Sequence, residues 1–319
     1  MSFHGRNPVN SLRISIVQYL NTAPLVRGFT HGPLLGKYRL SFTVPSQCAE
    51  DLRAGAADIA IIPAIEYQRI ANLVILPDLA IASKKSVRSL LLVSKKPMHE
   101  VQRIALDRTS RSTQALVHML CDRRWGIAPD CFEAEPNLGA MLDRADAALL
   151  IGDPALRLAI ASGPKAKRNL SGGRVIPAVA AGVSGTNELL LLDIVEQWHA
   201  MTSLPAVLAV WAARPEVTTA EVVQDFQDSL AFGLQHLDAI VAESAAEMNL
   251  PIGDLRRYFT ENIDYRLDEE NLSGLKEYYA LAARLGLIRN VDTIRIAAEP
   301  GRPARYMDFV SGRKDAAHR

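Results

Sequence analysis

The chain reads Leu12-Arg13-Ile14-Ser15-Ile16-Val17-Gln18-Tyr19-Leu20-Asn21-Thr22-Ala23-Pro24 close to its start. Residues 12–19 form an apolar run of strand length, and a short polar turn follows at once. Asn21 or Thr22 fits a helix cap, because its side-chain oxygen can accept a hydrogen bond from an unpaired N–H of the first turn. Pro24 fits the opening of that helix, where a missing N–H costs nothing. The stretch therefore predicts a strand that leads directly into a helix.

The same order of strand, turn and helix recurs along the chain. Further apolar runs occupy residues 40–44, 59–62, 104–106 and 147–151, and turn residues follow each of them. Helical patterns then cover about 47–54, 64–71 and 111–123, and another helix begins near Pro154. Ser46, Ser110 and Asp153 fit the caps of these helices. Strands that alternate with helices predict βαβ units and mostly parallel sheets, which is an α/β fold.

Two more apolar runs differ from these units. Neither 89–94 nor 206–212 is followed by a cap and a helix, so we expect them to pair as crossover strands that form a two-stranded hinge. The length of 319 residues suits two lobes of about 100–150 residues each. The expected division places residues 1–94 and 213–295 in lobe 1 and residues 95–212 in lobe 2.

The last third of the chain has a helical pattern. From residue 219 to about 247, apolar residues recur every three or four positions, as on one face of a helix. Asp268 is expected to cap a last helix that runs to Leu285, with Gly286 as its stop. The segment 296–319 contains Gly301, Pro303 and a basic end, and we expect it to be a poorly ordered tail.

Composition narrows the class of protein. Thirty-six Lys and Arg balance 35 Asp and Glu, so the net charge of +1 favours neither nucleic acid nor an anionic membrane as a partner. The three cysteines form no CxxC pair, which favours a reducing compartment. No apolar segment near the start resembles a signal peptide, and no uninterrupted apolar run reaches about 18 residues, the length of a membrane span. A cytoplasmic location is therefore expected.

The candidate site follows from the fold. In open parallel α/β sheets, ligands bind beyond the carboxyl ends of the strands, and helix N-termini there present N–H groups to anions. Facing lobes would direct all of these turns into one cleft. The densest hydroxyl cluster, residues 107–113, needs only one hydroxyl for capping, so its others are candidates for binding. Arg88 and Arg111 could clamp a carboxylate bidentately. The residues alone thus predict a two-lobed binder of a small anion and leave its chemistry open.

Known catalytic and cofactor motifs are missing from the sequence. The seven histidines are scattered, without an HExxH or Cys/His pattern, so no metal site is expected. No GxGxxG, GxxxxGK[ST] or GxSxG string occurs, so no nucleotide cofactor and no hydrolase elbow are expected.

Specific strings resemble one family. They are residues 16–25, 44–46, 55–63 with Glu66-Tyr67, 87–89, Leu106-Asp107 with Ser110 and Ser112-Thr113, 150–156, Trp198 with 202–205 and 209–211, and 262–267. In this order and spacing they resemble the chorismate dehydratases, which work in menaquinone biosynthesis by the futalosine route. The resemblance covers about residues 12–288.

The resemblance implies a type II periplasmic-binding-protein fold used as a lyase. Such an enzyme converts chorismate to 3-[(1-carboxyvinyl)oxy]benzoate, and no cofactor is expected. The resemblance places Asn21 and Ser89 at the reacting centre, with Asp153 orienting the departing hydroxyl or acting as an acid. The expected substrate-binding residues are Thr22, Ser46, Arg88, Thr109, Ser110, Ser112, Thr113 and Gly152.

Two alternatives stay open at this point. A non-catalytic solute-binding protein for a small carboxylate would share the fold, although such proteins normally carry a leader or a lipid-attachment cysteine. A sister lyase that forms dihydroxynaphthoate typically opens with a Ser-Pro-Cys-Pro-Asn-Asp string, and that string is absent from this sequence.

Overall fold

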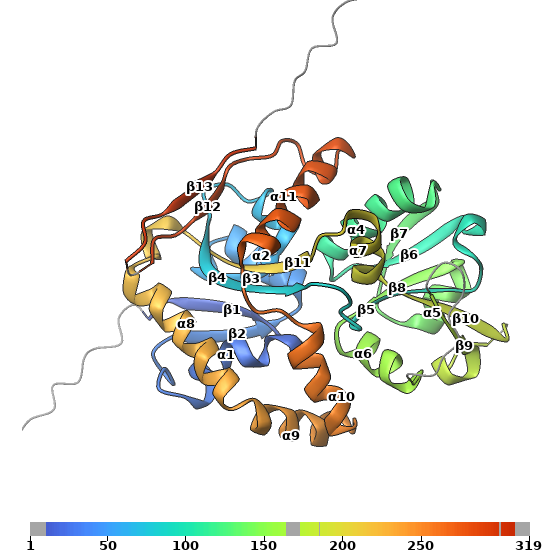
Figure 1. The fold of residues 1–319 in the computed structure, drawn as a ribbon, viewed down its shortest axis with the longest axis horizontal. Helices are drawn as coiled ribbons and strands as arrows, with labels where there is room; N and C mark the ends of the chain where they lie inside the picture. Colours follow the sequence, from blue (N-terminus) through green and yellow to red (C-terminus); the bar gives the residue numbers. More distant parts are fainter. Residues whose placement is uncertain (1–10, 164–172, 185, 300, 310–319) are drawn as a thin grey trace, which may run out of the picture.

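The computed structural model, which describes residues 11–163, 173–184, 186–299 and 301–309, has two lobes that are each built on one sheet (Figure 1). The sheet of lobe 1 has the strand order β13-β12-β4-β11-β3-β1-β2. Its strands are β1 (Arg13–Val17), β2 (Arg39–Thr43), β3 (Ile59–Pro63), β4 (Val74–Ser83), β11 (Ala206–Ala213), β12 (Ile294–Ile296) and β13 (Arg305–Met307). β1 pairs in parallel with β2 and β3, whereas β11 is antiparallel to both of its neighbours.

The sheet of lobe 2 has the order β7-β6-β8-β5-β10-β9. Its strands are β5 (Leu90–Ser94), β6 (Arg103–Asp107), β7 (Asp130–Ala134), β8 (Ala147–Ile151), β9 (Arg174–Pro177) and β10 (Glu188–Asp193). β6 is parallel to β7 and β8, and β5 is antiparallel to β8 and β10. Both sheets are therefore mixed, so the expectation of mostly parallel sheets was wrong, although the two-lobed α/β fold is confirmed.

Helices cover the sheets of both lobes. In lobe 1 they are α1 (Ala23–His31), α2 (Pro45–Arg53), α3 (Ala64–Tyr67), α8 (Ala220–Gln235), α9 (Leu237–Met248), α10 (Ile252–Arg257) and α11 (Glu269–Arg284). In lobe 2 they are α4 (Arg111–Leu120), α5 (Leu138–Arg144), α6 (Gly152–Ala161) and α7 (Ile194–Thr202). Short 3₁₀ turns cover Leu20–Thr22, Met98–Glu100, Ala178–Ala181 and Pro215–Val217, and π turns cover Cys121–Trp125 and Tyr258–Asn262. Among the described residues, no helix combines the length and apolarity needed to cross a membrane.

Close packing of α1 on α8 fixes the first helix of lobe 1. Gly233 touches the first turn of α1 so closely that a Cβ there would lie 2.0 Å from the carbonyl oxygen of Pro24. Ser229 of α8 accepts a hydrogen bond from the Gly28 N–H and donates one to the Leu25 carbonyl. Burial of apolar side chains beneath these helices supplies the main stabilisation of the lobe. The turn that precedes α1 is thereby held firmly at the carboxyl end of β1.

The predicted two-stranded hinge is wrong. β5 belongs to lobe 2 and β11 to lobe 1, and the two strands do not pair. Every residue of both strands is buried, which is typical of a central strand but does not reveal the partner strand. The chain crosses between lobes over residues 84–89 and again between β10 and β11, so the expected boundaries at 94 and 212 each misplace one strand.

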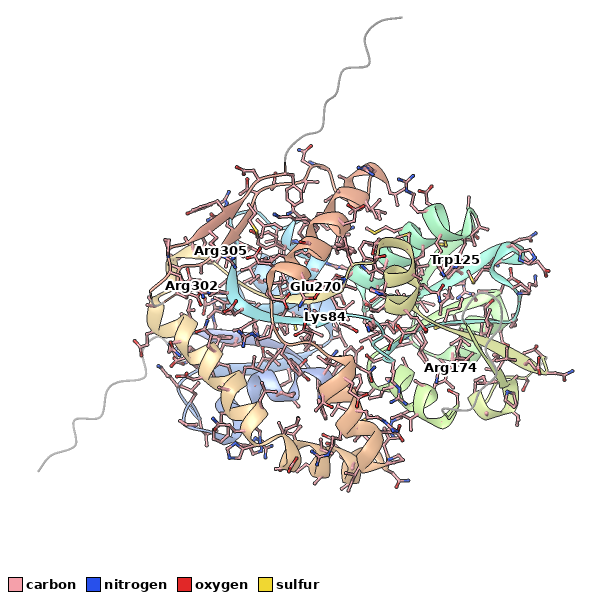
Figure 2. All side chains as sticks on the ribbon, viewed as in Figure 1. Lys84, Trp125, Arg174, Glu270, Arg302 and Arg305 are labelled. Carbon is pink, nitrogen blue, oxygen red and sulfur yellow. The ribbon has the colours of Figure 1, made fainter. Side chains whose placement is uncertain are left out.

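The first crossing is anchored in lobe 1 by Lys84. Its ammonium group lies 2.8 Å from Asp268 and 2.6 Å from Glu270 at the start of α11. Lys84 and Glu270 are labelled near the middle of Figure 2, close to the boundary of the lobes. The crossing segment thus leaves lobe 1 from a fixed point.

Helix capping differs from the sequence prediction. Asp268 caps α11 as expected and accepts a hydrogen bond from the Asn271 N–H. Thr22 and Ser110 occupy cap positions without a capping hydrogen bond from their side chains. Ser46 and Asp153 are not caps, because each lies inside its helix. Helix α2 begins at Pro45, after Val44, and α6 begins at Gly152, after Ile151. The polar residues of these turns therefore have other partners.

The expected disordered tail was wrong for its first part. β12 and β13 pair as an antiparallel hairpin, and Ile296 is buried against β4. Residues 310–319 lie outside the described residues. The predicted helix over 64–71 is also shorter than expected, since α3 ends at Tyr67.

Candidate functional site

Three turns of lobe 1 each donate one backbone N–H to lobe 2. The Leu20 N–H bonds to Oδ1 of Asp153 at 3.0 Å. The Ser46 N–H at the start of α2 bonds to the carbonyl oxygen of Thr109 at 3.1 Å. The Ile65 N–H at the start of α3 bonds to Oγ of Ser112 at 3.2 Å. The turns that follow β1, β2 and β3 therefore meet the turns that follow β6 and β8, and the two lobes are in contact at this point.

The N–H groups at the start of α4 differ from those of lobe 1, because within the described part of the chain they are not hydrogen-bonded. The backbone N–H groups of Arg111, Ser112 and Thr113 have no hydrogen-bond partner among the described residues. Ser112 and Thr113 are buried, with 3% and 2% of their surfaces exposed. Ser112 Oγ accepts the Ile65 N–H, and Thr113 Oγ1 accepts the hydroxyl of Ser110 at 2.7 Å, so both residues keep a hydroxyl proton to donate. This helix start can bind an anion through N–H and O–H groups together.

Thr109, by contrast, already uses its hydroxyl proton. Thr109 Oγ1 donates to Oδ1 of Asp107 at 2.7 Å, and the Thr109 N–H donates to the same oxygen at 2.9 Å. The hydroxyl of Tyr19 approaches Thr109 Oγ1 to 3.4 Å from the other lobe. Asp107 is fully buried, and its Oδ2 has no hydrogen-bond partner among the described residues. Burial raises the pKa of Asp107 above its usual value.

The turn between β8 and α6 lies against Tyr19. Gly152 has φ of +66°, a left-handed conformation that favours glycine, and a Cβ there would lie 2.8 Å from the Tyr19 ring. The Gly152 N–H donates to the carbonyl oxygen of Ser89 at 2.8 Å. Burial raises the pKa of Asp153, while its hydrogen bond from the Leu20 N–H acts in the opposite direction. Gly152, Asp153 and Ser89 therefore lie around the tyrosine.

Asn21 and Ser89 each have a donor to offer. Thr22 Oγ1 donates to Asn21 Oδ1 at 3.3 Å, and the Asn21 amide group has no hydrogen-bond acceptor among the described residues. The hydroxyl of Tyr258 donates to Ser89 Oγ at 2.9 Å, so the proton of Ser89 stays available. Asn21 follows Leu20, whose N–H bonds to Asp153, and the Ser89 carbonyl accepts the Gly152 N–H, so the backbone places both residues near Gly152 and Asp153.

The two arginines of the sequence prediction already have carboxylate partners. Arg88 lies 3.4 Å from Asp254, and it lines a cavity of about 300 Å³ beside Asp193. Arg111 pairs with Glu50 at 2.8 Å and with the buried carboxylate of Glu66 at 3.1 Å. Among the described residues, the Arg88 side chain makes no hydrogen bond or ion pair with the other predicted site residues, and Arg111 ties the start of α4 to lobe 1.

Comparison with known proteins places the chain in a family. A sequence profile described as menaquinone biosynthesis matches residues 12–284. The chain belongs to this menaquinone biosynthesis family. A relative named chorismate dehydratase, from Thermus thermophilus, is 28% identical over 277 residues, which cover 86% of this chain and 95% of that protein.

Solved structures resemble this member of the menaquinone biosynthesis family in fold. Protein AF1704 of Archaeoglobus fulgidus has a TM-score of 0.67 at 19% identity, over 88% of this chain and all of that chain. The alkanesulfonate-binding protein of Xanthomonas axonopodis, bound to MOPS, has a TM-score of 0.59 at 15% identity, over 89% and 96% of the two chains. These likenesses establish the periplasmic-binding-protein-like fold.

Sequence reasoning missed several residues of the site. Tyr19 and Asp107 stand in strings that match the family, but no role was assigned to either. A polar residue at or just beyond the carboxyl end of a strand was the signal that could have found both. Tyr258 follows α10, far along the chain, and no local pattern links it to Ser89. The hydrogen bonds that join the lobes were also not predictable, because they join turns distant in sequence.

Proposed function

We propose that this protein dehydrates chorismate to 3-[(1-carboxyvinyl)oxy]benzoate, as a hydro-lyase of menaquinone biosynthesis. Membership of the family and the relative named chorismate dehydratase support this proposal. The proposal includes action in the cytoplasm, without a metal or a nucleotide cofactor.

The start of α4 is the observation that carries the proposal. Chorismate has two carboxylates, and each needs hydrogen-bond donors that neutralise its charge. Three N–H groups of α4 have no partner in the described part of the chain, and together with the hydroxyl protons of Ser112 and Thr113 they are such donors. A helix N-terminus contributes about 0.3–1 kcal/mol to binding an anion, and up to about 2 when partly buried. Each charge-assisted hydrogen bond adds about 1.5–3 kcal/mol. Together they support binding of one substrate carboxylate at this place.

The chemistry requires positioning more than an added base. The ring C–H beside the ether breaks, its electron pair forms the new ring double bond, and the neighbouring hydroxide departs. Charge that develops on the ring carboxylate is stabilised by donors aimed at it, as in an oxyanion hole. The enolpyruvyl carboxylate of the substrate takes the proton when it is held against the C–H bond. In this proposal Asn21 and Ser89 hydrogen-bond the reacting centre, and Asp153 orients the departing hydroxyl.

The remaining predicted residues have supporting parts in this proposal. Thr22 turns the amide of Asn21, because it donates to the Asn21 oxygen. Ser110 fixes the hydroxyl of Thr113, and the Ser46 N–H holds the Thr109 loop. Gly152 gives Tyr19 room. The guanidinium of Arg88 is paired with Asp254, so Arg88 is proposed to act on the substrate only through its charge, from the edge of the site.

Substrate entry requires the lobes to separate. The N–H groups of Leu20, Ser46 and Ile65 are bonded directly to acceptors of lobe 2, so a ligand between the lobes must part these contacts. Over the described residues the chain crosses between the lobes at two places, which is compatible with a hinge motion.

Incubation of the purified protein with chorismate tests the proposal. We expect loss of chorismate and appearance of the benzoate product by liquid chromatography and mass spectrometry, against chorismate in buffer as the control for spontaneous breakdown. Binding of chorismate without conversion would indicate a solute-binding protein instead. Conversion of a cyclic futalosine derivative, with chorismate untouched, would indicate the sister lyase.

A further inference from the structure

Tyr19 reaches from lobe 1 into lobe 2 at the centre of the candidate site. It lies two residues beyond the end of β1, and its ring packs on Gly152 at the start of α6. Its hydroxyl lies 3.4 Å from Oγ1 of Thr109, at the end of β6. The next residue, Leu20, donates its N–H to Asp153. Tyr19 thus lies against Thr109 and Gly152 and next in sequence to the residue that bonds Asp153, yet none of the proposed roles uses its hydroxyl.

The direction of the hydrogen bonds makes Tyr19 a donor. Thr109 gives its hydroxyl proton to Asp107 at 2.7 Å, so Thr109 can only accept a hydrogen bond from Tyr19. Burial, helped by the charges of Asp107 and Asp153 and opposed by the hydrogen bond with Thr109, raises the pKa of Tyr19 to about 12, so the phenol keeps its proton at neutral pH. At 3.4 Å the contact with Thr109 is longer than an ordinary O–H···O bond, so the hydroxyl is only loosely tied to Thr109 and can turn to donate to a ligand instead.

We propose that Tyr19 donates the proton that converts the departing hydroxide of chorismate to water, with Thr109 and Asp107 as positioning residues. This inference rests on the proposed function. The ring C–H gives its proton to the substrate carboxylate and its electron pair to the new double bond. The C–O bond breaks with its pair on oxygen, and that oxygen takes the proton of Tyr19. The carboxyl group that accepted the ring proton then returns one to the tyrosinate, so the sum is product and water.

Tyr19→Phe is the decisive variant, because it removes the proton and keeps the ring that packs on Gly152. We expect kcat for chorismate to fall about 100-fold or more, as for loss of a general acid, with KM changed by less than about 3-fold. Affinity for the benzoate product is expected to stay unchanged, because the product has lost the hydroxyl that Tyr19 would protonate. Tyr306→Phe is the matched control, since Tyr306 is 68% exposed on β13.

Thr109 separates positioning from substrate binding. Thr109→Val removes the acceptor that faces Tyr19, and we expect kcat to fall about 10-fold with little change in KM. Thr109→Ser keeps the hydroxyl and is expected to restore kcat. A rise in KM with unchanged kcat in Thr109→Val would show that Thr109 binds a substrate carboxylate and would overturn its positioning role.

The outcomes separate this inference from the function on which it rests. If the wild-type protein does not convert chorismate, the proposed function fails and the role of Tyr19 fails with it. If the wild-type protein converts chorismate and Tyr19→Phe retains its kcat, the function stands and Tyr19 is not the donor. If Tyr19→Phe loses kcat and product affinity in equal measure, Tyr19 serves lobe contact rather than proton transfer, which also overturns the inference.

Discussion

The helix starts of lobe 1 and the start of α4 in lobe 2 arise from the same local pattern but end in different states. After β1, β2 and β3, one N–H of each turn is bonded to an acceptor of lobe 2. After β6, three N–H groups of α4 have no partner among the described residues. Both regions place a helix start within a few residues of the end of a strand, although β2 is largely exposed and β3 leads directly into α3. A strand-turn-helix motif therefore fixes where N–H groups are displayed, while the opposite lobe decides whether they hold the protein together or bind a ligand.

The contrast also explains how oxygens of lobe 2 can stand where a ligand would bind. Asp153, Thr109 and Ser112 present oxygens to the turns of lobe 1, much as a ligand anion would. In the separated state these oxygens and N–H groups would meet water or substrate instead. Closure thus exchanges hydrogen bonds of similar kind, so the free energy that separates the two states is expected to be small.

Gly152→Ala is expected to break the contact of the lobes most strongly. A Cβ at Gly152 would lie 2.8 Å from the Tyr19 ring, and the backbone has φ of +66°. A left-handed alanine costs about 1–2 kcal/mol, and overpacking adds about 1–3 kcal/mol. We expect kcat/KM for chorismate to fall about 100-fold, because the lobes can no longer meet.

Gly126→Ala is the matched control for that variant. Gly126 has φ of +62°, but a Cβ there meets nothing within 4 Å. It should lower the free energy of unfolding by about 1 kcal/mol and leave kcat/KM unchanged. Equal losses of activity in both variants would show that backbone strain, and not contact with Tyr19, is responsible.

The strands and turns compared here could largely be predicted from sequence, because they depend on the local pattern of apolar and polar residues. The strands β1, β3, β6 and β8 were found from apolar runs, and turn residues marked the carboxyl edge where the site lies. The partners of β5 and β11 could not be found, because uniformly buried strands carry no mark of their sheet. β4 was missed because Pro77 and Asp78 interrupt its apolar run. Pairing between distant strands is a property of the whole chain.

Ser112→Ala tests whether the start of α4 binds the substrate. It removes the acceptor of the Ile65 N–H and a hydroxyl proton proposed for a substrate carboxylate. We expect KM for chorismate to rise about 10-fold with kcat little changed, since one hydrogen bond to a charged group is worth about 1.5–3 kcal/mol. Ser110→Ala serves as the control, because the Ser110 hydroxyl already donates to Thr113 and should change KM by less than about 3-fold. Equal rises in KM would contradict the distinction between available and engaged hydroxyls.

Roles of single hydroxyls at the site were beyond sequence prediction. Thr109, Ser110, Ser112 and Thr113 look alike in a string, but the structure divides them into two that have used their protons and two that have not. The division depends on Asp107, on Ile65 and on the geometry of one helical turn. Spacing indicated a hydroxyl cluster and an anion, and only the hydrogen-bond directions indicate which members can donate.

At the start of α7, the backbone N–H groups are already bonded to a carboxylate of the protein itself. Asp193 accepts hydrogen bonds from the N–H groups of Val195 and Glu196 in α7, and from those of Val87 and Arg88 in the first crossing segment. Burial raises the pKa of Asp193 to about 6, with these N–H groups acting against the shift. The native state therefore binds a proton more tightly than the unfolded state, whose carboxyl has the ordinary pKa of 3.8.

This difference predicts a pH dependence of stability. The contribution of a raised pKa is fully present below about pH 4 and is lost as pH rises through about 6. We expect the free energy of unfolding of the wild-type protein, relative to Asp193→Asn, to fall by about 1 kcal/mol between pH 5 and pH 7 in urea titrations. Hydrogen bonds lost in the variant are lost at both pH values, so they cancel in this comparison.

Asp268→Asn supplies the matched control, since Asp268 also caps a helix but has a lowered pKa, in which the Asn271 N–H and Lys84 outweigh burial. Its titration falls below about pH 4, so the difference between wild type and Asp268→Asn should be flat from pH 5 to pH 7. A flat difference for Asp193 as well would mean that its four N–H donors outweigh its burial, and that its carboxylate is stabilised rather than penalised. In that case the start of α7 would resemble an anion site already filled by a side chain of the protein, which is the arrangement that α4 is proposed to reach only with substrate bound.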